Sequence, residues 1–221
     1  MNRLFVCLLL TAVAAVCIAA EPTPILSTSL DRARQQVAEG KFPEAVTSLD
    51  EADKSGGPSG RSLDLRGRIA MEQGQLDEAT KLFAEAHAKD AASLGQLHLG
   101  DVLLRQKKYS EARDAYRVAT KETNILVSYE RLRFGILLTY LGEKNDEAAQ
   151  QALDQIKFPS ESGAYYYAQA AWSYSHGQSR DAEKWIKRAE EIYPPKTTSW
   201  YARWLYDFGW NKIKPPLSPE Q

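Results

Sequence analysis

The chain has 221 residues, with 28 basic and 29 acidic side chains and a formal net charge of −1. This balance provides no basic surface of the kind that nucleic acids require, so nucleic acid is not expected as a partner. Both cysteines, Cys7 and Cys17, lie in the first twenty residues. Once that segment is removed, a disulfide, a thiol nucleophile and a cysteine metal site are excluded as well.

Residues 1–20 have the layout of a secretory signal peptide, with Arg3 as the positive start, an apolar stretch and a small residue at Ala20. We expect cleavage after Ala20 and export of the rest, either to the periplasm or out of the cell. A linker is predicted over residues 21–25. The alternative is an uncleaved membrane anchor over residues 4–20, because about 17 apolar residues reach the lower limit for crossing a bilayer.

A thirteen-residue pattern then recurs along the chain. Copies begin at Gly40, Gly74, Lys107 and Gly177, and each has an alanine five positions after its start. A looser copy begins at Gly142, where the corresponding alanine follows after six positions. Within each copy, apolar residues recur at offsets of three and four, which is the spacing of one helical face. Each copy therefore predicts a turn followed by a helix.

A second regularity precedes every copy. A small residue lies seven positions before each turn residue, and these residues are Ala33, Gly67, Gly100, Gly135 and Ala170. Two helices joined by a short turn must cross closely, so residues without bulk let their backbones approach while large residues fill the space beside them. The predicted structural signature of the repeat consists of Gly40, Ala45, Gly67, Gly74, Ala79, Phe83, Ala86, Gly100, Ala112, Tyr116, Gly135, Gly142, Gly177, Ala182 and Ala189.

Each unit of about 34 residues is thus a helix, a tight turn and a second helix, and it resembles the tetratricopeptide repeat. Five units begin near Leu26, Gly60, Ser93, Ser128 and Gly163. The resemblance implies an all-α fold, a right-handed solenoid of about eleven helices with its repeats over residues 26–195. A capping helix over residues 196–210 and a Pro-rich tail over residues 211–221 are predicted to follow.

The polar residues of the repeats do not form a catalytic pattern. An acid precedes each signature alanine, in the first turn of a helix, where the helix dipole favours negative charge. These acids occur once per repeat and do not converge. The three histidines lack ligand-like spacing, and motifs for a nucleophile or a phosphate loop are absent from the sequence. We expect no enzymatic activity, no cofactor and no metal.

The resemblance also implies where a partner binds, because in tetratricopeptide proteins the first helices of the repeats line an inner groove. The N-terminal half of this groove is expected to be charged and the C-terminal half aromatic. The predicted groove residues are Arg34, Arg68, His98, Asp101, Arg105, Arg133, Tyr140, Tyr167 and Tyr174.

All five tryptophans lie between Trp172 and Trp210, either as core and cap or partly as a binding surface. We interpret the chain as a non-catalytic scaffold or adaptor of the cell envelope that binds another protein or peptide. One alternative is a structural envelope protein that associates with itself. Another is a glycan-binding module that stacks its C-terminal aromatic rings on sugars. Membrane contact is expected only through the N-terminal segment, if that segment stays attached.

Overall fold

The computed structural model describes residues 24–54, 56–90, 94–122 and 126–217. The predicted signal peptide lies outside these residues. The described residues form eleven α-helices and no strand. The helices are α1 (Pro24–Ala38), α2 (Phe42–Asp53), α3 (Gly60–Glu72), α4 (Leu76–Lys89), α5 (Gly95–Arg105), α6 (Tyr109–Glu122), α7 (Leu126–Gly142), α8 (Asp146–Leu153), α9 (Ala164–Ser175), α10 (Ser179–Ile192) and α11 (Pro195–Asp207).

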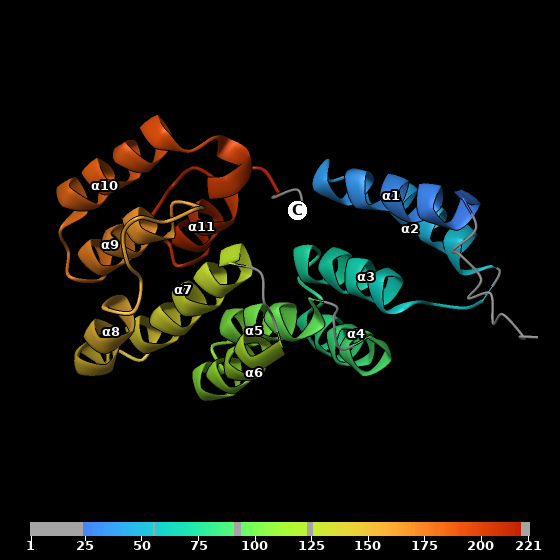
Figure 1. Ribbon diagram of the computed structural model, residues 1–221, viewed down its shortest axis with the longest axis horizontal. Helices are drawn as coiled ribbons and strands as arrows, with labels where there is room; N and C mark the ends of the chain where they lie inside the picture. Colours follow the sequence, from blue (N-terminus) through green and yellow to red (C-terminus); the bar gives the residue numbers. More distant parts are fainter. Residues whose placement is uncertain (1–23, 55, 91–93, 123–125, 218–221) are drawn as a thin grey trace, which may run out of the picture.

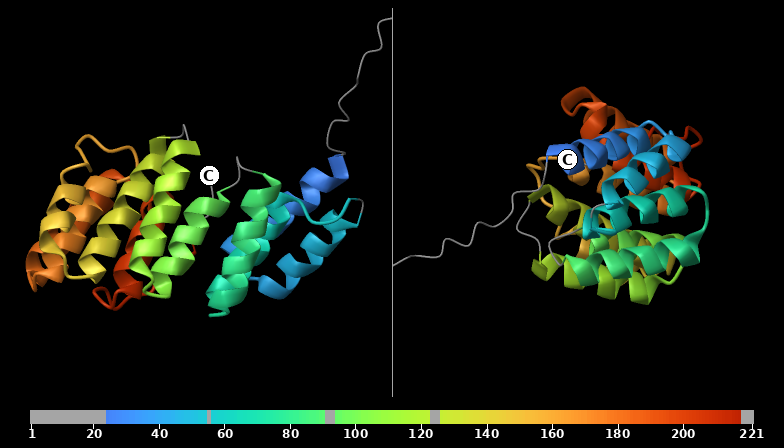
Figure 2. Two further views of the ribbon diagram at one scale, coloured as in Figure 1. Left: turned by 90° about the horizontal axis from the view of Figure 1, so that it is seen from below. Right: turned by 90° about the vertical axis from the view of Figure 1, so that its right-hand side faces the viewer.

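The first ten helices pack as five consecutive hairpins, from α1 with α2 to α9 with α10. The hairpins follow one another around an arc (Figure 1) and stand side by side along the long axis of the molecule (Figure 2). Helix α11 lies on the inside of the arc, beside α9 (Figure 1). This arrangement confirms the predicted all-α solenoid of helical hairpins.

The same pair of backbone hydrogen bonds closes the turn inside each hairpin. In the second hairpin, the amide of Gly74 donates to the carbonyl of Met71 (3.2 Å) and the amide of Gln75 donates to that of Ala70 (2.9 Å). The turn residue is left-handed, with φ of 77° at Gly74. Glycine adopts this conformation at little cost, which is why it commonly follows the last turn of a helix.

The fourth turn differs from the prediction. Its left-handed residue is Lys144, with φ of 57°, and not Gly142. The amide of Lys144 donates to the carbonyl of Leu141 (3.1 Å), as in the other four turns. The signature alanine is therefore Ala149, which is fully buried and lies five positions after the turn residue, as in the other repeats.

Gly142 is a glycine for a different reason. The ring of Tyr109 lies against it, and a Cβ at this position would be 2.5 Å from Cε1 of Tyr109. Two of the predicted small residues in the first helices also pack directly against an aromatic ring. A Cβ at Gly67 would be 2.6 Å from the ring of Phe83, and one at Gly100 would be 2.4 Å from the ring of Tyr116. These glycines make room for an aromatic ring of the neighbouring helix.

Two smaller groups of buried apolar residues hold the N-terminal repeats together, and one large group extends from α5 to α11. The C-terminal helix belongs to this large group, because Tyr201 and Leu205 are fully buried. The helix covers residues 195–207, slightly shorter than the predicted 196–210. Within the described part of the chain, each helix is too short or too polar to cross a bilayer.

Candidate functional site

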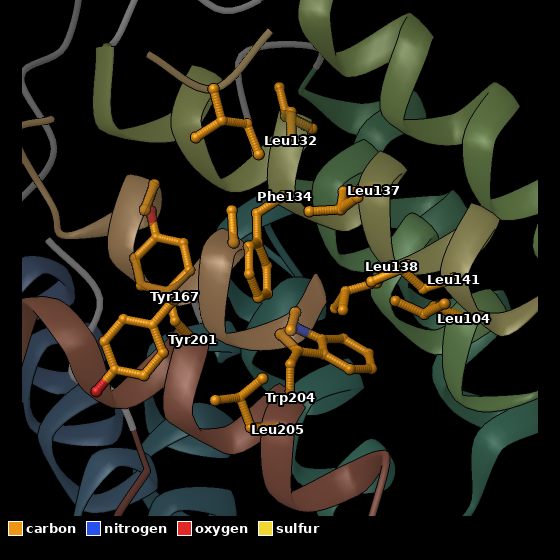
Figure 3. Close-up of a cluster of buried hydrophobic side chains, with 14 of the residues drawn as sticks. Leu104, Leu132, Phe134, Leu137, Leu138, Leu141, Tyr167, Tyr201, Trp204 and Leu205 are labelled. Atoms are coloured by element: carbon orange, nitrogen blue, oxygen red, sulfur yellow. The ribbon is translucent and has the colours of Figure 1, made fainter. Parts of the chain in front are cut away.

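Helix α11 fills the C-terminal half of the inner face of the arc. The ring of Tyr201 meets Phe134 of α7 edge-on, with centroids 5.1 Å apart, and stacks on Tyr167 of α9 at 5.7 Å (Figure 3). Trp204 and Leu205, on the same side of α11, are also buried. Aromatic side chains bury large areas, so these contacts stabilise α11 in this position. The inner face is a packed core here.

The structure places the three predicted groove tyrosines in different surroundings, and only Tyr167 is closed off from an open groove. Tyr167 is 1% exposed beneath α11, and burial raises the pKa of its phenol to about 12. Tyr174 is half-buried and stacks on Trp210, with centroids 6.3 Å apart. Tyr140 lies beneath the guanidinium of Arg113 on α6, 4.5 Å from the ring centroid. The resemblance to tetratricopeptide repeats implies which helices face inward, but not that the C-terminal helix covers them.

Four charged side chains join α11 to the N-terminal half of the arc, and we call them the ionic cluster. Arg203 Nη2 lies 2.6 Å from Glu72 Oε2 of α3, and Arg203 Nε lies 3.2 Å from Asp207 Oδ1. Arg105 Nη2 of α5 lies 3.1 Å from Glu72 Oε1 and 3.0 Å from Asp207 Oδ2. Each carboxylate therefore pairs with both guanidinium groups. The four side chains are 9–19% exposed, so solvent screens these pairs only weakly.

A cavity of about 70 Å³, the inner cavity, lies next to the ionic cluster, between α1, α3, α5, α7 and α11. A cavity of this size holds a few water molecules or one small polar group. Each of four helices contributes an arginine to its wall, and these residues are Arg68, Arg105, Arg131 and Arg203.

Two tryptophans of α11 also line the inner cavity. The guanidinium of Arg131 lies over the ring of Trp200, 5.5 Å from its centroid, and that of Arg105 lies 5.8 Å from the centroid of Trp204. A cation over an aromatic face is attracted by the ring quadrupole, most strongly where water is excluded. The tryptophans therefore hold both guanidinium groups at the cavity.

Two buried polar pairs lie on the α5 side of the inner cavity. His98 Nδ1 is 2.7 Å from Asp64 Oδ1 of α3, and the hydroxyl of Tyr116 donates to Asp101 Oδ1 at 2.8 Å. Burial raises the pKa of Asp101 to about 6, although the charge of His98 and the hydrogen bond from Tyr116 act in the opposite direction. Asp101 is therefore a carboxyl group that changes its charge near neutral pH.

Apart from the three tyrosines, the predicted groove residues divide into two groups. Arg68, His98, Asp101 and Arg105 meet at the inner cavity. Arg34 and Arg133 do not reach it: Arg34 is largely exposed and pairs with Asp31 (3.0 Å), and Arg133 is exposed and donates to the carbonyl of Gln155 (3.1 Å). The cavity residues absent from the prediction are Val37, Glu72, Arg131, Trp200, Arg203, Trp204 and Leu217.

The sequence contains one usable signal for these additional residues. Arg203 and Asp207 are four positions apart in a predicted helix, which places both on one face. The repeat period cannot indicate that this face meets α3, because it describes only contacts between neighbouring repeats.

A second hollow, of about 490 Å³, lies at the edge of the solenoid, and we call it the edge pocket. Its lining includes Lys107 of the third turn, Tyr109 at the start of α6, Gly142 at the end of α7, and Trp204 and Phe208 of the C-terminal segment. Trp204 and Arg105 line both hollows. Among the described residues, no group of three His, Cys, Asp or Glu side chains is arranged to hold a metal ion.

Comparison with known families agrees with this architecture. Residues 26–134 match the family model described as "Tetratricopeptide repeat-like domain". The chain carries a tetratricopeptide repeat-like domain. The match ends within α7, and the hairpins that follow continue the same architecture with the irregular fourth turn. Tetratricopeptide repeat domains generally mediate contacts between proteins and are typically non-catalytic.

Among solved structures, one that matches is a mutant of the protein MamA, which also contains tetratricopeptide repeats. It shares 18% sequence identity with the present chain, and the match covers 76% of this chain and 97% of that chain with a TM-score of 0.48. No curated protein sequence matches.

Proposed function

We propose that this tetratricopeptide repeat-like protein is a non-catalytic scaffold of the cell envelope that binds a partner protein at the inner cavity. The proposal depends mainly on one observation, the convergence of arginines from four helices and two tryptophans on one hollow. Arginine and tryptophan are enriched among the residues that contribute most to binding between proteins. The C-terminal half of the inner face is occupied by α11, so the inner cavity is the part of that face left for a partner.

The state of one arginine supports this location. Arg131 is 8% exposed, and its Nε has no hydrogen-bond partner among the described residues. A buried donor without an acceptor is costly, and a carbonyl or carboxylate oxygen from a partner would offset that cost. Export rests on the composition of residues 1–20, in which an apolar stretch follows Arg3.

Self-association is the second candidate, and an aromatic surface patch favours it. Phe158 is 61% exposed and meets the ring of Tyr165 edge-on, with centroids 5.8 Å apart. Trp185 of α10 lies beside Tyr165 at 6.1 Å. Exposed aromatic patches are common where proteins associate. This patch lies away from the inner cavity, so crosslinks from the two locations distinguish the two functions.

The test is site-directed photo-crosslinking of the tagged full-length chain in its native host. A photo-reactive amino acid replaces Met71, which lines the inner cavity, and in a matched control it replaces Lys81, whose side chain is 72% exposed on α4. We expect one foreign protein to crosslink in near-stoichiometric amount through position 71 and not through position 81. The purified pair should then re-form in solution.

Two outcomes would contradict this proposal. Recovery of the chain crosslinked only to itself would replace the scaffold by the self-associating protein. Equal capture from both positions would remove the inner cavity as the binding site. Mass spectrometry of the recovered chain tests export at the same time, because cleavage after Ala20 leaves Glu21 as the first residue, whereas an intact Met1 indicates an anchor.

A further inference from the structure

The edge pocket has the size of a binding site, and part of its wall is apolar. Its volume of about 490 Å³ lies within the range of about 300–1,000 Å³ typical of ligand pockets. Leu104 and Leu141, both buried, contribute apolar surface to it. Trp204 and Phe208 form an edge-to-face pair on the α11 side, with centroids 6.4 Å apart. Such a pocket accepts a bulky apolar or aromatic side chain.

The geometry of Tyr109 shows how the opposite wall is kept in place. Its ring rests on Gly142, where even a Cβ would come within 2.5 Å of it. The lack of a side chain at Gly142 therefore lets the ring lie close to the end of α7. The wall is built from the turn of one repeat and the helix end of the next.

The unpaired charge at this edge is positive. Among the charged groups of the pocket, Arg105 and Asp207 pair with each other at 3.0 Å. Lys107 is exposed, and its side chain makes no ion pair or hydrogen bond with another described residue. Lys144, also exposed, lies two residues beyond Gly142 at the next turn. The edge therefore presents two ammonium groups beside a hollow whose wall combines apolar and charged side chains.

The backbone at both lysines argues that their side chains are needed. Lys107 and Lys144 are left-handed, with φ of 60° and 57°, at the position where the other three turns have glycine. A side chain in this conformation costs free energy that glycine does not. Residues kept in costly conformations are often found at functional sites. The two turns beside the edge pocket are the two that carry lysine.

We propose that the edge pocket binds an acidic segment of a partner protein. An aromatic or aliphatic side chain of the segment enters the pocket, and its carboxylates pair with Lys107 and Lys144. Lys144 lies outside the pocket lining, so a ligand that reaches both the pocket and this lysine must be longer than the pocket. An extended peptide meets this requirement. The inference rests on the proposed scaffold function, because it takes the ligand to be a protein.

The test uses synthetic peptides and a variant that leaves the turns intact. The probe is a fluorescein-labelled peptide Glu-Asp-Phe-Asp-Glu, and its two controls replace the phenylalanine by serine or all four acids by lysine. The double variant Lys107→Gly, Lys144→Gly removes both ammonium groups and places glycine where the backbone favours it. A matched double variant, Lys81→Gln, Lys184→Gln, removes the same charge from exposed positions on α4 and α10.

We expect the parent protein and the matched variant to bind the acidic phenylalanine peptide equally, as measured by fluorescence anisotropy. The glycine variant should bind it at least tenfold more weakly, while its melting temperature equals or exceeds that of the parent. A variant that is more stable and binds less cannot be explained by loss of fold. The serine and lysine peptides should bind the parent at least tenfold more weakly than the probe.

Three results would overturn the inference: no binding of the probe to the parent, equal binding by the glycine variant, or equal weakening in the matched variant. The scaffold proposal has separate outcomes. If a foreign protein crosslinks at position 71 while the glycine variant still binds the probe, the scaffold stands and the edge site fails. If the probe binds as expected and no foreign protein is captured at position 71, the edge site stands and the scaffold proposal fails.

Discussion

The ring of Tyr116 lies between two hairpins, at glycines of α5 and α7. A Cβ at Gly100 would come within 2.4 Å of this ring and one at Gly135 within 2.6 Å, so the ring takes the space of two side chains. Its hydroxyl donates to Asp101 at the inner cavity. The sequence indicates that small residues are required at these positions. It does not indicate that one tyrosine requires both and also orients a carboxyl group of the candidate site.

Asp101 should make stability depend on pH. Burial raises its pKa from 3.8 to about 6, so between pH 4 and pH 6 the folded protein binds more protons than the unfolded chain. The stabilisation that Asp101 contributes is fully present below about pH 4. It is lost as pH rises through about 6, which lowers the free energy of unfolding by about 3 kcal/mol. In the Asp101→Asn variant, the free energy of unfolding should not show this decrease as pH rises. Urea titrations at pH 4, 5, 6 and 7 measure the difference, and parallel curves for the two proteins would contradict the prediction.

At the scale of single elements, the fourth repeat shows where local signals compete. Glycine is the preferred residue for a helix-ending turn, so Gly142 is the natural choice from sequence. In the structure Tyr109 requires that glycine for packing, and Lys144 accepts the left-handed position instead. A side-chain contact from the preceding repeat decides the register, and a pattern confined to one repeat does not contain that contact.

The register based on Gly142 and the register based on Lys144 predict opposite effects for two neighbouring alanines. Ala149 of α8 is fully buried where this helix packs on α7, so Ala149→Asp places an unpaired charge in the core and should cost several kcal/mol, on the order of 3–5. Ala148 is half-buried in the first turn of α8, where the helix dipole favours an acid, so Ala148→Asp should change stability by less than about 1 kcal/mol. Thermal melting followed by circular dichroism separates them, and the reverse order would restore the register based on Gly142.

The position of α11 shows a further limit of sequence at the element scale. The spacing of apolar residues predicts a helix with one buried face. It does not predict whether that face covers the end of the last repeat or the inner side of the arc. In the structure it packs on α9 and on Phe134 of α7, and this choice removes Tyr167 from the candidate site.

At the scale of the whole molecule, the repeat period predicts a solenoid of helical hairpins, and the resemblance to tetratricopeptide repeats implies which helices face inward. The resemblance also implies that Arg68, His98, Asp101 and Arg105 lie near one another, because equivalent positions of successive first helices align along the inner face. Glu72 and Arg203 belong to the same site through a contact that is not periodic. Their pairing depends on how tightly the arc curves, which is a property of the assembled structure.

The ionic cluster should stabilise this curvature. Glu72→Gln leaves the guanidinium groups of Arg105 and Arg203 without one of their two carboxylates in a poorly solvated place, and should lower the free energy of unfolding by about 3 kcal/mol. Glu51→Gln removes an exposed partner of Arg32 and should cost less than about 1 kcal/mol. Urea titrations at low salt measure both free energies of unfolding. Equal decreases in the two variants would show that the ionic cluster stabilises the fold no more than an exposed ion pair.

The contact between Arg203 and Glu72 joins positions 131 residues apart. In an open array each repeat touches only its neighbours, and a terminal repeat can melt by itself while the others stay folded. Here melting of the C-terminal helix also takes a partner away from the second repeat. The C-terminal helix and the second repeat are thermodynamically linked, so local unfolding of one destabilises the other, and the repeats between them are expected to unfold as one cooperative unit.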